Sequence, residues 1–438
     1  MATTTLDSLP TTVPPPGPGG PRIAEMATAM RGSEILRIAA EIRVRAATGE
    51  RICNLTVGDF DPQQFRIPKL LEELITEGLR KGETNYPPSN GMASLREAVR
   101  VFYRDQLGLD YPVESVLITA GSRPGIYGVF RTLLDPGDRV VYPVPSWNNN
   151  HYCHLTGAID VPVLCGPETA FLPTRALLED AVRGARLLSL NSPLNPTGTA
   201  FDADTLREIC DLVVEENARR GSGERPLYVM YDQVYWQLTF GSTRHVDPVS
   251  LNAAMAPFTI YVDGISKAFA ATGVRVGWVV GPTDIITPMS NFLGHVGAWA
   301  PRAEQGATAI LLGQPNEIAA YRSTFTEGVK QRLDALYHGV IALREAGHPL
   351  SAIEPMGAMY LSAQFDLVGK RTVDGHVLQS NDDIRRWLLE ESGLAVVPFQ
   401  AFGMRDESGW CRLSAGAVSL SDIRHGLGRL GAALEELT

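Results

Sequence analysis

The chain has 438 residues, of which 44% are hydrophobic and 20% charged, and its formal net charge is −10 at pH 7. This length is sufficient for two domains with large buried cores. Acidic and basic residues are mixed along the chain, whereas a protein that binds nucleic acid presents a basic face, so nucleic acid is not expected as a partner. No run of about 18 uncharged apolar residues occurs, and no membrane span is expected.

Five cysteines are scattered along the sequence without a CxxC pair: Cys53, Cys153, Cys165, Cys210 and Cys411. This pattern disfavours a zinc site or a disulfide framework and favours a reducing cytoplasm, so we expect small, buried, free thiols. Residues 1–24 include a run rich in proline and glycine at 14–21 and lack the apolar core of a signal peptide. We expect them to form a disordered tail.

The segment 25–58 begins with a helical pattern and ends in a short strand at 52–57. Over residues 59–312, short apolar runs then alternate with segments of helix length. These runs predict strands at 115–119, 139–143, 187–190, 227–231, 260–262 and 276–280. Continuous apolar strands that alternate with helices predict an α/β fold with a mostly parallel sheet covered by helices on both faces.

A long helical pattern follows, from about residue 287 to 345, with an expected break around residues 313–315. The remaining chain mixes strands at 358–364 and 394–398 with helices at 381–392 and 420–437. We therefore expect a large domain over 59–312 and a smaller α+β domain over 313–438. The N-terminal arm, residues 25–58, is expected to join the smaller domain.

In an open α/β sheet, ligands bind beyond the carboxyl ends of the strands. The residues that follow the predicted strands are Gly121, Ser122, Trp147, Asn195, Asp232, Tyr235, Lys267 and Arg275. They supply an amine, a carboxylate, a phenol, an amide, a guanidinium and an indole to one rim. Pyridoxal phosphate needs a lysine for its aldehyde and an acid for its pyridine nitrogen, besides donors for its 3-oxygen and phosphate and an aromatic face for its ring.

Five motifs, in order along the chain, resemble those of class I/II aminotransferases, the aspartate aminotransferase family. Residues 266–277 resemble the lysine signature, residues 195–198 the NPTG loop and residues 231–235 the D-x-x-Y element. Residues 85–97 resemble the family's Y-x-x-x-x-G motif followed by LRE. Residues 398–414 resemble its C-terminal segment, in which FG is followed by RLS. The resemblance implies fold type I, in which a mostly parallel sheet of the seven-stranded type lies between helices beside a smaller α+β domain.

The resemblance also implies roles for the candidate residues. Lys267 binds pyridoxal 5'-phosphate as a Schiff base and moves the substrate proton, and Asp232 pairs with the pyridine nitrogen. Tyr235 and Asn195 donate to the 3-oxygen of the cofactor. Ser266, Arg275 and the backbone of Gly121 and Ser122 bind the phosphate, and Trp147 stacks on the ring.

Arg412 is expected to bind the α-carboxylate of the substrate through a forked pair of hydrogen bonds, together with Asn195 and the backbone N–H of Gly58. Tyr86 matches a tyrosine that reaches the phosphate of the neighbouring subunit, which implies a homodimer with shared active sites. Asn150 stands where some members have a histidine beside the aspartate, and it could hydrogen-bond Asp232.

The sequence leaves the amino donor open between aspartate and an aromatic or neutral amino acid. Arg123, Arg302 and His295 are candidates to bind a side-chain carboxylate, and Trp299 could instead line an apolar pocket. The favoured reaction is transfer of the amino group of an L-amino acid to a 2-oxoacid such as 2-oxoglutarate. A lyase reaction by β-elimination is the alternative. A non-enzymatic regulator is disfavoured, because the 22 residues before the first helix leave no room for a DNA-binding domain.

Overall fold

The computed structural model describes residues 23–30, residue 32 and residues 34–438. The predicted disordered tail, residues 1–24, lies outside this range except for its last two residues. The short helix α1 (Glu25–Ala29) belongs to a separate unit that ends at Gly32, and the chain from Ser33 onward forms one compact unit. All site residues discussed below lie in this second unit.

The central sheet has seven strands in the order β2-β8-β7-β6-β5-β3-β4. The strands are β2 (Val116–Thr119), β3 (Arg139–Val144), β4 (Ile159–Leu164), β5 (Leu187–Asn191), β6 (Tyr228–Asp232), β7 (Thr259–Gly264) and β8 (Gly277–Val280). Strand β8 runs antiparallel to β2 and β7, and every other pair is parallel. The predicted mostly parallel sheet is therefore confirmed.

Strand β4 was not predicted from the sequence. It lies at the edge of the sheet and pairs only with β3. Ile159 and Leu164 at its ends are 53% and 60% exposed, and Pro162 lies inside it. Such a half-exposed edge strand lacks the continuous apolar run that marks a strand buried on both faces, and proline is tolerated there because an edge strand need not donate to the ladder.

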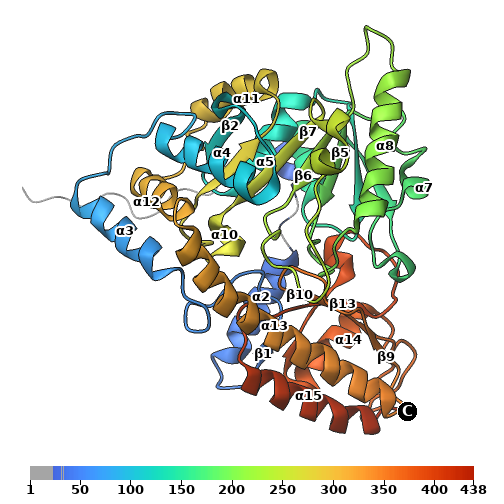
Figure 1. Ribbon diagram of the computed structural model, residues 1–438. Coiled ribbons are helices and arrows are strands. Elements are labelled where there is room, and N and C mark those ends of the chain that lie inside the picture. Colours follow the sequence, from blue (N-terminus) through green and yellow to red (C-terminus); the bar gives the residue numbers. More distant parts are fainter. Residues whose placement is uncertain (1–22, 31, 33) are drawn as a thin grey trace, which may run out of the picture. The chain divides into compact units, whose positions relative to one another are not determined.

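Helices pack on both faces of this sheet, as Figure 1 shows with their labels. One apolar cluster includes residues of α3 (Lys69–Arg80), α4 (Ala93–Leu107), α8 (Ala203–Arg219) and α12 (Arg302–Leu312), and a second includes residues of α5 (Ser122–Leu133), α6 (Asn149–Thr156) and α11 (Thr283–His295). Tyr231 and Tyr261 face the first cluster, whereas Met230 and Val262 face the second. This alternation follows from the two-residue period of a strand.

The rest of the compact unit is built on two smaller sheets. Four antiparallel strands have the order β12-β13-β10-β9, and they are β9 (Leu350–Ala352), β10 (Tyr360–Phe365), β12 (Val397–Pro398) and β13 (Trp410–Ser414). In addition, β1 (Cys53–Asn54) pairs in parallel with β11 (Leu394–Ala395). The predicted strands at 358–364 and 394–398 correspond to β10 and to β11 with β12, whereas β9 and β13 were not predicted.

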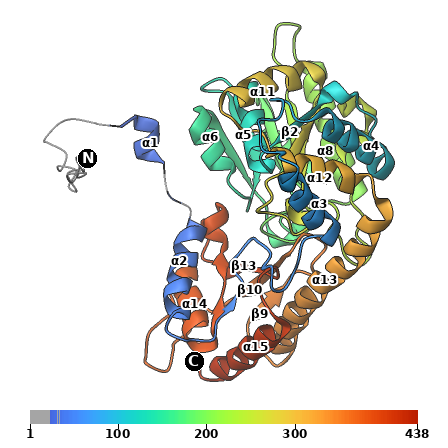
Figure 2. The same cartoon turned by 90° about the vertical axis from the view of Figure 1, so that its left-hand side faces the viewer.

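The predicted helical stretch from 287 to 345 consists of α11, α12 and α13 (Pro315–Glu345). The break before Pro315 was predicted, but the one at residues 296–301 was not. There Gly297 adopts a φ of +68° and Pro301 precedes α12, and both features end or restart a helix. In α13, Ile318 packs in the core of the large sheet, whereas Val340 packs in a separate core with Leu361 of β10. Figure 2 shows α13 running toward α15 (Leu420–Glu435). We retain the division at 312/313 as a proposal.

The N-terminal arm packs against the C-terminal part of the chain. Ile38 and Ile42 of α2 (Glu34–Ala46) join an apolar cluster with Phe399 and Trp410. The buried Arg385 of α14 (Asn381–Trp387) pairs with Glu41 of α2 at 3.1 Å. Strand pairing, apolar contact and this ion pair together fix α2 next to the cavity described below.

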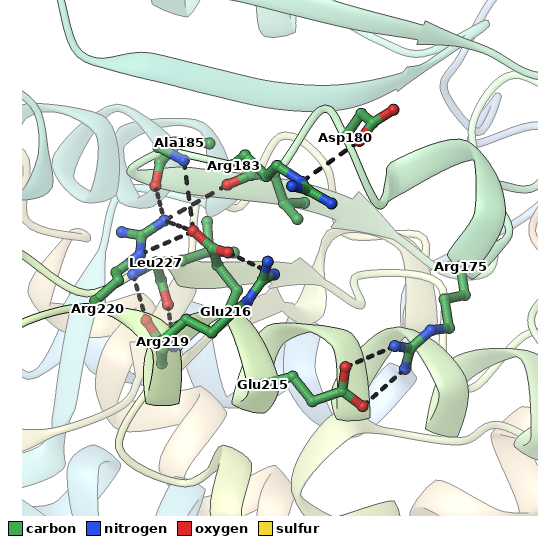
Figure 3. A network of polar contacts seen from close by, with 12 residues as sticks. Arg175, Asp180, Arg183, Ala185, Glu215, Glu216, Arg219, Arg220 and Leu227 are labelled. Atoms are coloured by element: carbon green, nitrogen blue, oxygen red, sulfur yellow. Dashed lines mark hydrogen bonds and ion pairs between the residues drawn. The ribbon is translucent and has the colours of Figure 1, made fainter.

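A buried ion pair joins the end of α8 to the segment just before β5, as Figure 3 shows. Glu216 is 6% exposed, and its carboxylate lies 3.0 Å from Arg220 and 2.8 Å from Arg219. Arg220 also donates to the carbonyl oxygen of Ala185 at 2.7 Å. These contacts satisfy charged groups that would be costly to bury alone.

Candidate active site

A cavity of about 420 Å³ lies where the carboxyl ends of the parallel strands face β10 and β13. Most of the predicted site residues line it: Gly58, Ser122, Trp147, Asn195, Asp232, Tyr235, Lys267 and Arg412. Ile35 and Ala39 of α2 line it as well. The volume is within the usual range for small-molecule sites. The structure therefore brings these residues together at one cavity, although more than 300 positions separate Gly58 from Arg412, and their roles stay a prediction.

Lys267 follows β7 on the short helix α10 (Ile265–Ala268), and its Nζ atom donates to the carbonyl oxygen of Gly58 at 2.6 Å. Burial lowers the pKa of Lys267 to about 8. The charge of Asp59 opposes this shift, and the charges of Arg412, Arg123 and Arg275 add to it. A lysine amine with a pKa near 8 is neutral in a substantial fraction close to that pH, and the neutral amine is suited to attack an aldehyde.

Asp232 ends β6 and faces the same cavity. Burial raises the pKa of its carboxyl group to about 6, while the N–H of Val234 and the charge of Lys267 counteract the shift. The Val234 N–H donates to Oδ1 at 3.2 Å, and this is the hydrogen bond that the described residues make to the carboxylate. Asp232 is thus a buried acid with capacity to accept a further, charged donor from the cavity.

Arg412 lies on β13, only 1% exposed, with its guanidinium 4.7 Å from the ring centre of Tyr360 and 4.9 Å from that of Phe402. It donates to Asn195 Oδ1 at 3.1 Å and to the carbonyl oxygen of Thr56 at 2.6 Å. Its Nε atom is buried without a hydrogen-bond partner. A buried guanidinium with an unused donor, at the wall of a cavity, is suited to bind a carboxylate.

Gly121 directly precedes the cavity-lining Ser122 and lies against Arg275, and Ser266 directly precedes Lys267, but none of the three lines the cavity itself. Arg275 donates to the carbonyl oxygens of Ala120 at 2.8 Å and Thr272 at 2.6 Å, which fixes it beside the first turn of α5. A Cβ atom at Gly121 would lie 2.3 Å from Arg275 Nη2, so only glycine permits this approach. A helix N-terminus with an arginine beside it is a ready anion site.

The structure separates the three candidates for a side-chain carboxylate. Arg123 lines the cavity, lies 4.3 Å from the ring centre of Trp147 and forms no ion pair with any described residue. Arg302 instead pairs with Glu83. Neither Arg302 nor the exposed His295 lines the cavity of this chain.

Tyr86 does not reach the cavity of its own chain. It is 81% exposed, and its ring packs against the edge of Trp299 with the centroids 5.5 Å apart. This placement agrees with a residue that acts elsewhere than in its own subunit, but its role in a neighbouring subunit remains a prediction.

The suggestion that Asn150 hydrogen-bonds Asp232 is wrong. Asn150 is exposed, whereas Asn149 is buried and lines the cavity. Asn149 accepts from Ser189 Oγ at 2.8 Å and donates to Ser146 Oγ at 3.1 Å. The error is one of helical phase: α6 begins at Asn149, and successive side chains on a helix point about 100° apart.

Sequence reasoning also missed Tyr360, which lies on β10, is 1% exposed and lines the cavity. Its hydroxyl lies 2.8 Å from the hydroxyl of Tyr235. The residue fell inside a predicted strand, but β10 is antiparallel, and no rule about carboxyl ends applies to such a strand. The signal that could have found it is a polar aromatic residue in an otherwise apolar strand core.

Comparison with known proteins assigns the fold and the site to a family. The chain belongs to the aminotransferase class I and II family, whose sequence model matches residues 50–430. Members of this family are pyridoxal-phosphate enzymes. Because the family and the relatives described next are aminotransferases, the chain is a transaminase.

Several of the similar proteins are aspartate aminotransferases, and one similar solved structure is the aromatic aminotransferase of Pyrococcus horikoshii. The enzyme of Rhizobium meliloti strain 1021 is 28% identical over 409 residues, which cover 93% of this chain and 94% of the relative. A crystal structure of the Rhizobium meliloti enzyme matches with a TM-score of 0.87 at 27% identity, covering 96% of this chain and 100% of that one. The Thermus thermophilus enzyme with maleate matches with a TM-score of 0.83 at 28% identity, covering 94% and 99%.

Among the described residues, no helix combines the length and apolar character needed to cross a membrane. Nor do these residues bring three or more histidine, cysteine, aspartate or glutamate side chains together in a way that could hold a metal ion.

Proposed function

We propose that the cavity binds pyridoxal 5'-phosphate through Lys267 and that the chain transfers amino groups from L-amino acids to 2-oxoacids such as 2-oxoglutarate. The observation that carries this proposal is that Lys267 and Asp232 face one cavity with a fixed anion site beside it. Asp232 has capacity for a cationic donor, and Gly121 lets the Arg275 guanidinium approach the first turn of α5, where a Cβ atom would lie 2.3 Å from Nη2. The residues present therefore fit the cofactor.

When bound, the cofactor would supply an electron sink for the charge that develops on the substrate Cα atom. Asp232 would keep the pyridine nitrogen protonated, and Tyr235 and Asn195 would donate to the 3-oxygen. Ser266, Arg275 and the N–H groups of Gly121 and Ser122 would hold the phosphate, and Trp147 would stack on the ring. Arg123 packs on the ring of Trp147, so that arginine would lie close to the bound cofactor.

With the substrate bound, the Lys267 amine would be free to take the proton from the substrate Cα atom. The hydrogen bond to the Gly58 carbonyl oxygen, at 2.6 Å, sets the position of this amine. Its burial and the positive charges of the nearby arginines favour the neutral, basic form. Arg412, with Asn195 and the Gly58 N–H, would hold the α-carboxylate and so fix the Cα–H bond toward the amine. This geometry supports stereospecific proton transfer.

For the amino donor we propose an amino acid with an acidic side chain, with aspartate as the first candidate. Of the three candidates for a side-chain carboxylate, Arg123 is the one that lines the cavity, and it has no ion-pair partner among the described residues, so it can pair with a distal carboxylate. The names of the relatives support this choice, as does maleate, a dicarboxylate, with the Thermus thermophilus enzyme.

We further propose a homodimer in which Tyr86 contacts the phosphate in the partner's site, because an 81% exposed tyrosine packed on a tryptophan is suited to an interface. A cytoplasmic location is proposed as well, and five buried free thiols among the described residues support it.

An amino-donor screen tests the function. Each L-amino acid is added to the cofactor-loaded protein without oxoacid, and the loss of absorbance of the lysine-bound cofactor is followed. Aspartate and glutamate should convert the cofactor faster than phenylalanine. A protein in which no amino acid changes the absorbance would contradict the proposal.

The variant Arg123→Gln tests the donor class. It should lower kcat/KM for aspartate by about tenfold to a hundredfold, the effect of losing a charge-assisted hydrogen bond, with little change for phenylalanine. Arg131→Gln is the matched control, because Arg131 lies on the same helix and outside the cavity. Equal losses for both donors in Arg123→Gln would refute the assignment.

A further inference from the structure

Tyr360 touches three parts of the site at once. Its hydroxyl lies 2.8 Å from that of Tyr235, and the two rings meet edge to face with centroids 5.7 Å apart. Its ring lies 4.7 Å from the Arg412 guanidinium. A Cβ atom at Gly58 would lie 3.0 Å from its hydroxyl. Tyr360 thus joins the phenol, the guanidinium and the backbone that the proposed function assigns to cofactor and substrate.

The sheet register explains the contact with Arg412. On the paired strands β10 and β13, Ser362 lies opposite Arg412. Tyr360 is two residues away on the same strand, so its side chain projects from the same face as that of Ser362. The ring therefore packs beside the guanidinium, which has Phe402 within 4.9 Å as well. Two aromatic rings restrict a side chain that would otherwise sample many rotamers.

The pair of hydroxyls contains two protons, because both phenols stay neutral. Burial raises the pKa of Tyr235 well above 10, and it also raises the pKa of Tyr360. One O–H group must be used within the pair, and the other is left for a third acceptor. Which tyrosine donates decides whether Tyr235 can donate into the cavity.

The surroundings favour Tyr360 as the donor within the pair. The Arg412 guanidinium lies 4.7 Å from the Tyr360 ring centre, and a positive charge in contact with the ring makes the attached hydroxyl a better hydrogen-bond donor. Tyr235 lies nearer the lysine, with its ring centre 5.9 Å from Lys267 Nζ, and it lines the cavity that the proposed cofactor would occupy.

We propose that Tyr360 is a positioning residue: its hydroxyl donates to Tyr235, which directs the Tyr235 proton to the 3-oxygen of the cofactor, while its ring holds Arg412 in place for the substrate carboxylate. This inference rests on the proposed function. It predicts that the hydroxyl and the ring of one residue affect two different measurements, because the first acts on the cofactor and the second on the substrate.

The variant Tyr360→Phe removes the hydroxyl and keeps the ring. Tyr235 then loses a donor that polarises its own O–H group, so it stabilises the 3-oxygen less. The midpoint of the pH titration of the bound-cofactor absorbance should rise by about half a unit. The KM for amino donors should change less than about twofold, because the ring still packs on Arg412. The variant Tyr360→Leu should also raise that KM by about tenfold.

A double variant separates this role from a merely structural one. On a Tyr235→Phe background, Tyr360→Phe should cause no further shift of the midpoint, because its effect passes through the Tyr235 hydroxyl. Tyr321→Phe is the matched control, since the Tyr321 hydroxyl donates to the Arg66 carbonyl oxygen at 2.8 Å and Tyr321 does not line the cavity. It should leave both the midpoint and KM unchanged.

Equal midpoints in the wild type and Tyr360→Phe, or the same shift on both backgrounds, would overturn the inference. The dissociation constant of pyridoxal phosphate, measured by titrating the cofactor-free chain, gives a readout without turnover and should rise for Tyr360→Phe. A wild-type protein that shows no absorbance from a lysine-bound cofactor would instead refute the proposed function itself, so the two failures are distinguishable.

Discussion

The Nζ atom of Lys267 lies 2.6 Å from the carbonyl oxygen of Gly58, a residue 209 positions earlier in the chain. The adjoining Asp59 is bonded by the hydroxyl of Thr272, in the segment that follows the lysine. Two hydrogen bonds therefore join the segment after β1 to the segment after β7, one from Lys267 and one from Thr272. Replacement of Lys267, or of the charged Asp59, should show how these contacts affect the reactivity of the amine.

We expect Lys267→Ala to lose nearly all turnover, because no other described lysine lines the cavity. Borohydride reduction of the cofactor-loaded wild type, followed by peptide mapping, should place the label on Lys267. Lys330→Ala, which removes a lysine of α13 that pairs with Asp334, is a suitable control and should retain the label. A label on any other lysine would refute the assigned site.

The reaction of the cofactor-free chain with pyridoxal phosphate should depend on pH. Burial lowers the pKa of Lys267 to about 8, and the neutral amine is the nucleophile. Below pH 8 the rate should therefore rise about tenfold per unit and then level off above it. Asp59 stabilises the charged amine, so Asp59→Asn should move the midpoint to lower pH. A midpoint near 10.5 in the wild type would contradict the described environment.

For Asp232→Ala we expect weak cofactor binding and a fall in turnover of several orders of magnitude, because a charge interaction with the transition state is lost. Asp232→Glu keeps the charge and should recover part of the rate. Stopped-flow measurement of the first half-reaction separates this effect from cofactor loss, since it can be made at saturating cofactor. Turnover near that of the wild type in Asp232→Ala would exclude the assigned role.

Most of the cofactor-binding residues that the sequence predicted share one property: they follow strands of the large sheet. The carboxyl ends of such strands meet at one edge, so Asn195, Asp232 and Lys267 could be placed together without coordinates. Their motifs further fix which residue in each loop is meant. Arg412 lies on an antiparallel strand, and only the resemblance to a family identified it.

What could not be predicted depends on orientation and on contacts between distant segments. Asn149 and Asn150 are adjacent, and only the start of α6 decides which one faces inward. Tyr360 and Tyr235 are 125 positions apart, and their contact depends on how two sheets face each other. The sequence makes Arg302 a candidate for the substrate pocket, but in the structure it pairs with Glu83, a contact that the sequence does not reveal.

The ion pair of Glu216 and Arg220 predicts a loss of stability without a loss of chemistry. Both side chains are largely buried, at 7% and 8% exposed, so Glu216→Gln leaves a buried guanidinium short of its counter-ion. We expect a loss of about 3 kcal/mol in the free energy of unfolding, measured by denaturant titration. Glu215→Gln, which breaks a more exposed pair with Arg175, should cost less than about 1 kcal/mol. Equal losses in the two variants would contradict this account.

The last prediction concerns the residue that every amino-acid substrate should contact. Arg412→Lys replaces a planar fork with a single ammonium, which cannot bond both oxygens of a carboxylate in the same way. KM should rise for aspartate and phenylalanine alike, by about tenfold or more, and kcat should also fall because the Cα–H bond is no longer aligned. Arg332→Lys is a matched control, since Arg332 is also stacked on an aromatic ring, 4.6 Å from Phe65, but lies outside the cavity. An increase in KM confined to aspartate would move Arg412 from the α-carboxylate to the side-chain pocket, which contradicts the division of roles between Arg412 and Arg123.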